Sequence, residues 1–298
     1  MSAAEAVDAE PLVVDAHTHI FTPDVVRGRE AYVGRDLWFE HLYADPRALL
    51  VTSDDLLASM EAAGIDQSVV CGFPWHDPGI CREQNDYLSE ACAGSGGRLF
   101  WLGSVSPTHR AHASDEAARC FALGAVGIGE LNADAQRFDL TSTTDLGAVV
   151  EACVAHDKPL MLHTTEPVGH SYPGKGTATP DRLVRFLENH PLVRVVAAHW
   201  GGGLPFYELM PEVARVAARV VYDSAASTYL YRFEVFRTVL DLVGPDRVLF
   251  ASDFPVLRQD RFLRRVRQTP WRDSAEMARV LGENARHIYR LPEREVQG

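Results

Sequence analysis

Eight short apolar runs alternate along the chain with longer stretches that have the spacing of amphipathic helices. The runs are rich in Val and Leu, which is typical of parallel strands buried on both faces. A strand followed by a helix, repeated eight times, predicts an α/β fold of the closed (β/α)8 TIM-barrel type. The runs lie at 12–16, 67–72, 98–105, 125–130, 159–163, 193–199, 219–224 and 247–252. The helices are predicted at 54–63, 81–93, 112–122, 145–156, 180–190, 205–217, 230–243, 274–281 and 283–290.

The continuity of this pattern predicts a single domain. No linker, internal repeat or low-complexity segment divides the 298 residues, and barrels of this kind run to roughly 250 residues as one unit. An open doubly wound sheet with fewer strands is the alternative, but no GxGxxG motif follows the first run. We therefore expect residues 1–298 to form one barrel domain.

Two long connections follow predicted strands. Residues 20–52 come after the first strand and carry several aromatic residues, while residues 164–179 come after the fifth. Loops that follow strands build the active-site face of such a barrel, and exposed filler is seldom so aromatic. We expect the 20–52 insertion to be an active-site lid.

Charge and cysteine content exclude several classes of function. The chain has 41 acidic residues against 29 Lys and Arg, a net charge of −12, which argues against nucleic-acid and anionic-membrane partners. The five cysteines form no CxxC pair, and residues 1–11 have neither the basic nor the apolar part of a signal peptide. These features predict a cytoplasmic protein with a small-molecule substrate. These features are compatible with a homodimer and do not require one.

The end of the first predicted strand reads Asp15-Ala16-His17-Thr18-His19. Side chains two apart in a strand point to the same side, so His17 and His19 face one point. Two neutral imidazoles that converge at a barrel mouth are a natural start for a Zn²⁺ or similar transition-metal site. Two unrelated strand-end histidines are the alternative, because this short motif is common.

Four further polar residues stand where other predicted strands end. They are Glu130 after the fourth strand, His163 after the fifth, His199 after the sixth and Asp253 after the eighth. The carboxyl ends of barrel strands meet at the face where catalytic residues gather. Together with the first pair, these residues predict a metal centre rather than scattered histidines.

The sequence resembles the amidohydrolase superfamily of metal-dependent barrels, and more narrowly its amidohydrolase family 2 branch, which includes aminocarboxymuconate-semialdehyde decarboxylase. The matching stretches span nearly the whole chain in order. They are DAHTHIF (15–21), FPWHDPGICREQNDYL (73–88), VGIGEL (126–131), the strand ending at His163, HWGGGLPF (199–206), SDFP (252–255) and ENARHIYRL (283–291).

The resemblance implies roles for the strand-end residues. It implies that His17, His19, His163 and Asp253 are metal ligands, and that His199 is a second essential histidine. Glu130 matches an acidic position that bridges two metals in some relatives, whereas others bridge with a carbamylated lysine. The only lysines, Lys158 and Lys175, lie away from the end of the fourth strand. We favour one divalent ion, zinc, over two ions bridged by Glu130.

These groups predict an enzyme with Asp253 and His199 as its catalytic residues. The main expectation is a hydrolase in which a metal-activated water attacks an amide, ester or lactone of a small, carboxylated substrate. Asp253 would take the proton of this water and pass it to the leaving group. The alternative is a non-oxidative decarboxylase of an aromatic or muconate-type acid. A non-catalytic barrel with a structural metal ranks third, because structural zinc sites are usually rich in cysteine.

Loop residues near the predicted strand ends are candidate substrate contacts. An arginine at this face can bind a carboxylate through two hydrogen bonds, and a surface ion pair is the alternative for each one. The candidates are Trp75, His76, Arg82, His170, Tyr172 and Arg258.

Overall fold

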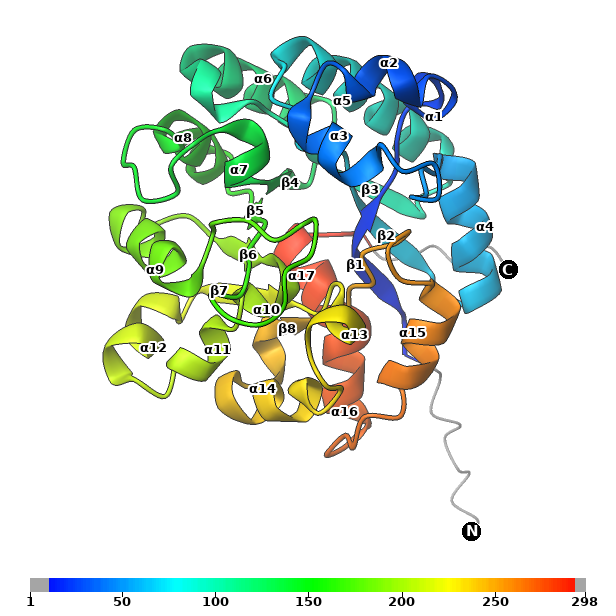
Figure 1. Ribbon diagram of the computed structural model, residues 1–298. Helices are drawn as coiled ribbons and strands as arrows, with labels where there is room; N and C mark the ends of the chain where they lie inside the picture. The colour runs from blue at the N-terminus through cyan, green and yellow to red at the C-terminus, as the bar shows by residue number, and fades with distance from the viewer. Residues whose placement is uncertain (1–10, 293–298) are drawn as a thin grey trace.

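The computed structural model describes residues 11–292 and shows a TIM barrel, a ring of helices around eight parallel strands (Figure 1). The strands pair in sequence order, so each neighbour in the chain is a neighbour in the sheet. Every predicted strand position is confirmed. The strands are β1 (Val14–His19), β2 (Gln67–Cys71), β3 (Leu99–Gly103), β4 (Gly127–Leu131), β5 (Leu160–Leu162), β6 (Val195–Ala197), β7 (Val220–Asp223) and β8 (Val248–Leu249).

Backbone contacts between the last and first strands close the ring. Ala16 N donates to Phe250 O at 2.9 Å, and Thr18 forms a parallel bridge with Phe254. Asp253 N also donates to His17 O at 2.9 Å. Because these bonds continue past the end of β8, the segment that carries Asp253 is fixed directly beside β1.

Helices cover the outside of the barrel after each strand. The predicted helix at 205–217 is divided in the structure, and the one at 230–243 starts later, at Val235. No helix within residues 11–292 is long and apolar enough to cross a bilayer. The helices outside the first insertion are α4 (Ser53–Ala63), α5 (Pro78–Gly94), η1 (Pro107–His109), α6 (Arg110–Ala122), α7 (Ala133–Gln136), α8 (Gly147–Ala155), α9 (Pro180–Asn189), α10 (Ala198–Gly201), α11 (Leu204–Tyr207), α12 (Pro211–Ala217), α13 (Ser227–Leu230), α14 (Val235–Val243), η2 (Pro245–Arg247), α15 (Gln259–Val266), α16 (Ser274–Ala278), η3 (Arg279–Glu283) and α17 (Asn284–Tyr289).

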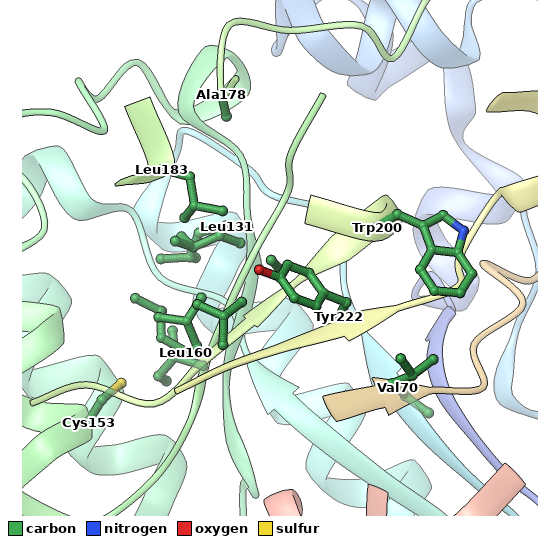
Figure 2. Close-up of a cluster of buried hydrophobic side chains, with 14 of the residues drawn as sticks. Val70, Leu131, Cys153, Leu160, Ala178, Leu183, Trp200 and Tyr222 are labelled. Atoms are coloured by element: carbon green, nitrogen blue, oxygen red, sulfur yellow. The ribbon is translucent and has the colours of Figure 1, made fainter. Parts of the chain in front are cut away.

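The apolar core has two parts. The larger part lies between the strands and the surrounding helices, where Leu160, Leu183 and Tyr222 are fully buried (Figure 2). The smaller part fills the barrel and includes Met161 and Tyr289, the second of which comes from α17. Such a filled interior is a packed core rather than a pore, so the open face at the strand ends is left for chemistry.

The insertion after β1 contains three short helices, α1 (Pro23–Arg27), α2 (Arg29–Val33) and α3 (Leu37–Tyr43). Its two ends are joined, because Phe21 N donates to Val51 O at 2.8 Å. Its aromatic side chains form a separate apolar cluster with residues that follow β2. The buried members of this insertion cluster are Phe21, Val25, Phe39, Phe73, Trp75, Ile80 and Cys81.

Candidate metal centre and cavity

Six polar side chains meet at the carboxyl ends of the strands. Four of them are histidines and two are carboxylates, and all are buried or nearly so. They are His17 and His19 of β1, Glu130 of β4, His163 directly after β5, His199 after β6 and Asp253 after β8. The structure thus brings together all six residues that the sequence selects as catalytic or metal-ligating.

The register of β1 places both of its histidines. Its pairing with β2 shifts between Asp15 and Thr18, and the side chains of His17 and His19 meet with their Nε2 atoms 3.0 Å apart. Asp15 is fully buried at the base of this segment, where its Oδ2 accepts from Gln259 Nε2 at 2.8 Å. This bond ties β1 to α15 and fixes the strand beneath the site.

His199 is presented by a turn with left-handed backbone angles. Its φ is 57° and that of Trp200 is 58°, and three glycines with positive φ follow. A side-chain-bearing residue in this region costs about 1–2 kcal/mol. The turn is held by His199 N, which donates to Asp223 Oδ1 at 2.9 Å, and by Trp200 Nε1, which donates to Ser227 Oγ at 2.7 Å.

One nitrogen of each histidine ring is engaged away from the centre. The partner is in every case an oxygen that only accepts, so the ring nitrogen is the donor. These bonds fix the tautomer and orientation of each ring, as outer partners do for metal-bound imidazoles. They run from His17 Nδ1 to Asp223 Oδ2 (2.9 Å), His19 Nδ1 to Gly72 O (3.3 Å), His163 Nε2 to Gly174 O (3.0 Å) and His199 Nδ1 to Ala225 O (3.4 Å).

The second nitrogens of the four rings converge on Glu130. His163 Nδ1 lies 3.0 Å from Glu130 Oε1 and 3.2 Å from His199 Nε2, while His17 Nε2 lies 3.6 Å from Glu130 Oε2. In neutral rings these nitrogens carry lone pairs, and lone pairs that face one another repel. A divalent cation among them removes the repulsion, so the donor set fits a metal.

The donors fall into two groups that share one carboxylate. The first group contains His17, His19 and Glu130, and the second contains Glu130, His163 and His199. Asp253 stands beside the first group, with its Oδ1 3.3 Å from His19 Nε2 and 3.9 Å from His17 Nε2. Glu130 therefore occupies the position between the two groups.

The carboxylates and imidazoles at the centre shift one another's pKa values. Burial by itself raises the pKa of Glu130, but His17 and His163 hold that pKa well below its usual range. Burial lowers the pKa of His199, yet the hydrogen bond and the charge of Glu130 outweigh it and raise the pKa to about 9. Without a cation, the ionised carboxylate of Glu130 and the protonated form of His199 stabilise each other.

A cavity of about 550 Å³ opens above these side chains. Its floor contains donors of the metal centre, and its walls come from the first insertion, the β5 loop and the segments after β2, β4, β7 and β8. The wall residues are Trp38, Leu42, Tyr43, Arg47, Ala48, Leu49, Phe73, Pro74, Asn132, His170, Tyr172, Gly174, Ala226, Tyr229, Leu230, Pro255 and Val256.

Two of the predicted substrate contacts, His170 and Tyr172, line this cavity. Tyr172 is held in place because its hydroxyl donates to Glu166 Oε2 at 2.8 Å and lies 3.1 Å from Thr165 Oγ1. Both residues belong to the long connection after β5, so this loop forms part of the cavity wall.

Trp75 and His76 are placed elsewhere. Trp75 is fully buried in the insertion cluster, with its Nε1 donating to Gln84 Oε1 at 2.8 Å. His76 N donates to Asp36 Oδ2 at 3.2 Å. Neither residue lines the cavity, because the chain after β2 turns beneath the insertion and supports it.

The two arginines predicted as carboxylate binders also miss the cavity. Arg82 lies on α5, where its Nη1 is 3.3 Å from Glu116 Oε2. Arg258 is 65 % exposed, and its Nη2 lies 3.1 Å from Asp260 Oδ2. Both arginines therefore pair with carboxylates of the chain, Arg82 with the buried Glu116 and Arg258 with Asp260 at the surface.

Sequence reasoning missed Asp223 and Arg47. Asp223 closes the apolar strand β7, and the rule that selected the other strand-end residues would have found it. Arg47 lines the cavity from the insertion and has no sequence signal, because its position depends on how the segment after α3 folds back.

Solved structures of similar fold include several decarboxylases. The chain superposes on 5-carboxyvanillate decarboxylase from Sphingomonas paucimobilis with a TM-score of 0.80 and 19 % identity, covering 95 % of this chain and 100 % of the other. It superposes on 2,6-dihydroxybenzoate decarboxylase from Rhizobium with a TM-score of 0.73 and 19 % identity, covering 94 % of this chain and 99 % of the other. A third structure is dihydroxybenzoic acid decarboxylase from Polaromonas sp. JS666, crystallised with manganese and the inhibitor 2-nitroresorcinol. Its TM-score is 0.75 and its identity 17 %, and the superposition covers 97 % of this chain and 100 % of the other.

A sequence profile described as amidohydrolase matches residues 14–291, nearly the whole chain. No curated protein matches the sequence at a significant level. The profile, the eight-stranded barrel and the strand-end donors agree, and the chain belongs to the amidohydrolase family of enzymes.

Proposed function

We propose that this enzyme is a metal-dependent, non-oxidative decarboxylase of aromatic acids. The sequence made a hydrolase the main expectation and a decarboxylase the alternative. The structural relatives that are decarboxylases support the alternative better. Because identity to them is below 25 %, the argument for this chain rests on its own cavity.

The observation that carries the proposal is the contrast between the walls and the floor of the cavity. The floor presents imidazoles and carboxylates, whereas the walls are largely aromatic and aliphatic, with side chains such as Trp38, Phe73 and Leu230. Flat apolar walls favour a ring, and a few polar groups at one end orient it. A volume of about 550 Å³ accommodates a single substituted ring.

The carboxylate of such a substrate would be received at the floor. Arg47 is the one Lys or Arg among the cavity residues, and its side chain is 89 % exposed at the rim beside Asp45. The walls therefore offer little positive charge at depth. A buried carboxylate needs a charged partner, and the metal centre is where this chain can hold one.

His17, His19, His163 and Asp253 would hold the cation, with Glu130 between the two donor groups. A divalent metal bound there would act as a Lewis acid toward an oxygen of the substrate. Imidazole and carboxylate donors suit both zinc, the ion favoured from sequence, and manganese, the ion in a structural relative. Metal analysis of protein purified without chelator would identify the ion and count it.

The residues of the chain then have to deliver one proton. Decarboxylation breaks the bond from the ring carbon to the carboxylate, leaves the electron pair on that carbon and forms a C–H bond in its place. Asp253 faces His19 at 3.3 Å and His199 faces Glu130 at 3.2 Å, so both side chains border the floor. Despite burial, Glu130 raises the pKa of His199 to about 9, so His199 would deliver the proton. Despite burial, the neighbouring histidines lower the pKa of Asp253, so its carboxylate would accept a replacement proton from solvent and pass it on. The apolar wall residues would pack against the faces of the ring.

The test uses hydroxybenzoic acids labelled with ¹³C in the carboxyl group. The metal-loaded enzyme is expected to release labelled CO₂ and, in heavy water, to place one deuterium on the ring carbon that lost the carboxylate. Asp253→Asn and His199→Gln are each expected to reduce this release by at least 100-fold. Melting curves of both variants show whether the fold is intact.

A parallel panel of esters, lactones and amides of the same acids separates the two reactions. Hydrolysis of that panel with no labelled CO₂ from the acids would make the enzyme a hydrolase and refute the proposal. Release of CO₂ that survives complete removal of metal would refute its metal dependence.

A further inference from the structure

Tyr43 brings a hydroxyl group to the wall of the catalytic cavity. It is the last residue of α3, in the insertion between β1 and β2. Within residues 11–292, no hydrogen bond joins this hydroxyl to another group of the protein. A cavity hydroxyl without a partner in the protein is free to bind a group on a ligand.

The ring of Tyr43 is fixed by the insertion cluster. It lies 5.0 Å from the ring of Phe39, and it meets Phe21 and Phe73 edge to face at 5.2 and 5.9 Å. All three phenylalanines are buried. Because packing holds the ring, little conformational freedom would be lost when the hydroxyl binds a ligand.

Tyr43 lines the same cavity as Glu130 and Asp253. Burial, followed by the negative charges of Asp253 and Glu130, raises the pKa of Tyr43 above its ordinary value. The hydroxyl therefore keeps its proton at neutral pH and acts as a donor. A donor on the wall of the cavity that contains the strand-end donors is placed to reach an oxygen of a ring held in that cavity.

We infer that Tyr43 is a specificity-determining residue that donates a hydrogen bond to a hydroxyl oxygen on the ring of the substrate. This inference deepens the proposed function and rests on it, since it assumes an aromatic acid in the cavity. It identifies the substrates as hydroxylated rings, with the carboxylate toward the strand-end donors and a ring oxygen toward Tyr43. Acids without that oxygen would take the place of water beside the hydroxyl and leave it unpaired, which is costly.

The experiment compares two probes on the metal-loaded enzyme by calorimetry. One is 2-nitrophenol, which carries a ring hydroxyl, and the other is nitrobenzene, which does not. Tyr43→Phe is expected to weaken binding of 2-nitrophenol about 10-fold or more and to leave binding of nitrobenzene unchanged. Equal losses for the two probes, or no loss for either, would overturn the inference.

Tyr32→Phe is the matched control. Tyr32 belongs to the same insertion and packs against Phe39 and Trp75, with ring centres 6.4 and 5.7 Å apart, but it lines a neighbouring hollow rather than the catalytic cavity. Tyr32→Phe also removes a phenolic oxygen from the insertion cluster, but one that does not line the catalytic cavity. This variant should therefore bind both probes like the wild type. A loss in Tyr32→Phe equal to that in Tyr43→Phe would show a packing effect and refute the assignment.

Turnover separates this inference from the proposed function. If the wild type releases no CO₂ while 2-nitrophenol binding still depends on Tyr43, the decarboxylase proposal fails and the recognition role holds. If the wild type releases CO₂ while Tyr43→Phe keeps the wild-type KM and probe affinities, the recognition role fails and the decarboxylase proposal holds.

Discussion

Asp223 accepts a hydrogen bond from His17, with 2.9 Å between Oδ2 and Nδ1, and both side chains are fully buried. The other oxygen of Asp223 accepts from the backbone N of His199 and of Ala225. One carboxylate thus orients a donor ring on β1 and the turn after β6. Asp223 therefore lies behind the two donor groups and links them through hydrogen bonds.

Replacing Asp223 by Asn is expected to weaken metal binding by 10- to 100-fold, because a partner behind a ligating histidine fixes its tautomer and its basicity. Metal retained after dialysis against graded chelator measures the effect. If the variant retains metal like the wild type, His17 is not oriented by this bond.

Gly202 lies where the turn after β6 touches the β5 loop. A Cβ at this position would stand 2.3 Å from Thr165 O, and the φ of +61° is already unfavourable for alanine. We expect Gly202→Ala to reduce the free energy of unfolding and to displace His199, which lowers activity. Urea denaturation and turnover measure the two effects.

Gly64→Ala is the control for backbone strain alone. Gly64 closes α4 with a φ of +69°, and an added Cβ would meet nothing within 4 Å. It should cost about 1–2 kcal/mol of stability and leave turnover unchanged. Gly202→Ala is expected to cost about 1–3 kcal/mol more, the range for overpacking. Equal losses would mean that the β5 loop yields to the methyl group.

Asp36 fastens the insertion to the barrel. Its Oδ1 caps α3 by accepting from Trp38 N and Phe39 N, and its Oδ2 accepts from His76 N after β2. Asp36→Ala is expected to cost about 1–2 kcal/mol as a lost cap and to raise KM, because the insertion forms much of the cavity wall. Limited proteolysis should then cut within 20–52.

Asp77→Ala provides the comparison for that experiment. Asp77 caps α5 through Gly79 N and Ile80 N, without a bond to the insertion. It should lose similar stability while KM and the proteolysis pattern stay those of the wild type. A KM that rises equally in both variants would show that general destabilisation, rather than loss of the bond between Asp36 and His76 N, is responsible.

Asp15 predicts a pH dependence of stability. Burial raises the pKa of this carboxyl to about 6, against 3.8 for the unfolded chain. The folded state therefore binds more protons between these values, so the contribution of Asp15 is fully present below pH 4 and is lost as pH rises through 6. The loss amounts to about 3 kcal/mol.

Urea titrations from pH 4 to 7, in chelator, measure this contribution when wild type and Asp15→Asn are compared. The variant cannot ionise at this position, so its free energy of unfolding should fall less over the range. Parallel curves for the two proteins would assign the dependence to other groups.

The barrel was predictable from the sequence because each strand is buried on both faces and so appears as an unbroken apolar run. Even β8, which contains only Val248 and Leu249, stands out through its apolar neighbours. The predicted helix at 205–217 was less accurate, since Pro211 starts a new helix and separates α12 from α11. Local breaks of this kind depend on packing as much as on composition.

The polar residues of the centre were predictable for the same reason, because a polar side chain that ends an apolar barrel strand lies at the face where catalytic residues gather. The cavity walls were not. Arg82 and Arg258 looked like carboxylate binders by their place in the chain, but Glu116 and Asp260 pair with them. Which loop residues face the cavity depends on contacts between segments far apart in sequence, as with Arg47.

The bond from Phe21 N to Val51 O brings the two ends of the insertion together at the rim of the barrel. Because the excursion between these residues starts and finishes at one place, its length and content can change without moving β1 or β2. The candidate metal donors lie on the strands or directly after them, whereas Tyr43 and Arg47 belong to the excursion. The residues to which we assign the chemistry and the residue to which we assign substrate recognition therefore lie in separable segments, and exchanging residues 21–51 between related barrels is expected to change which substrates bind.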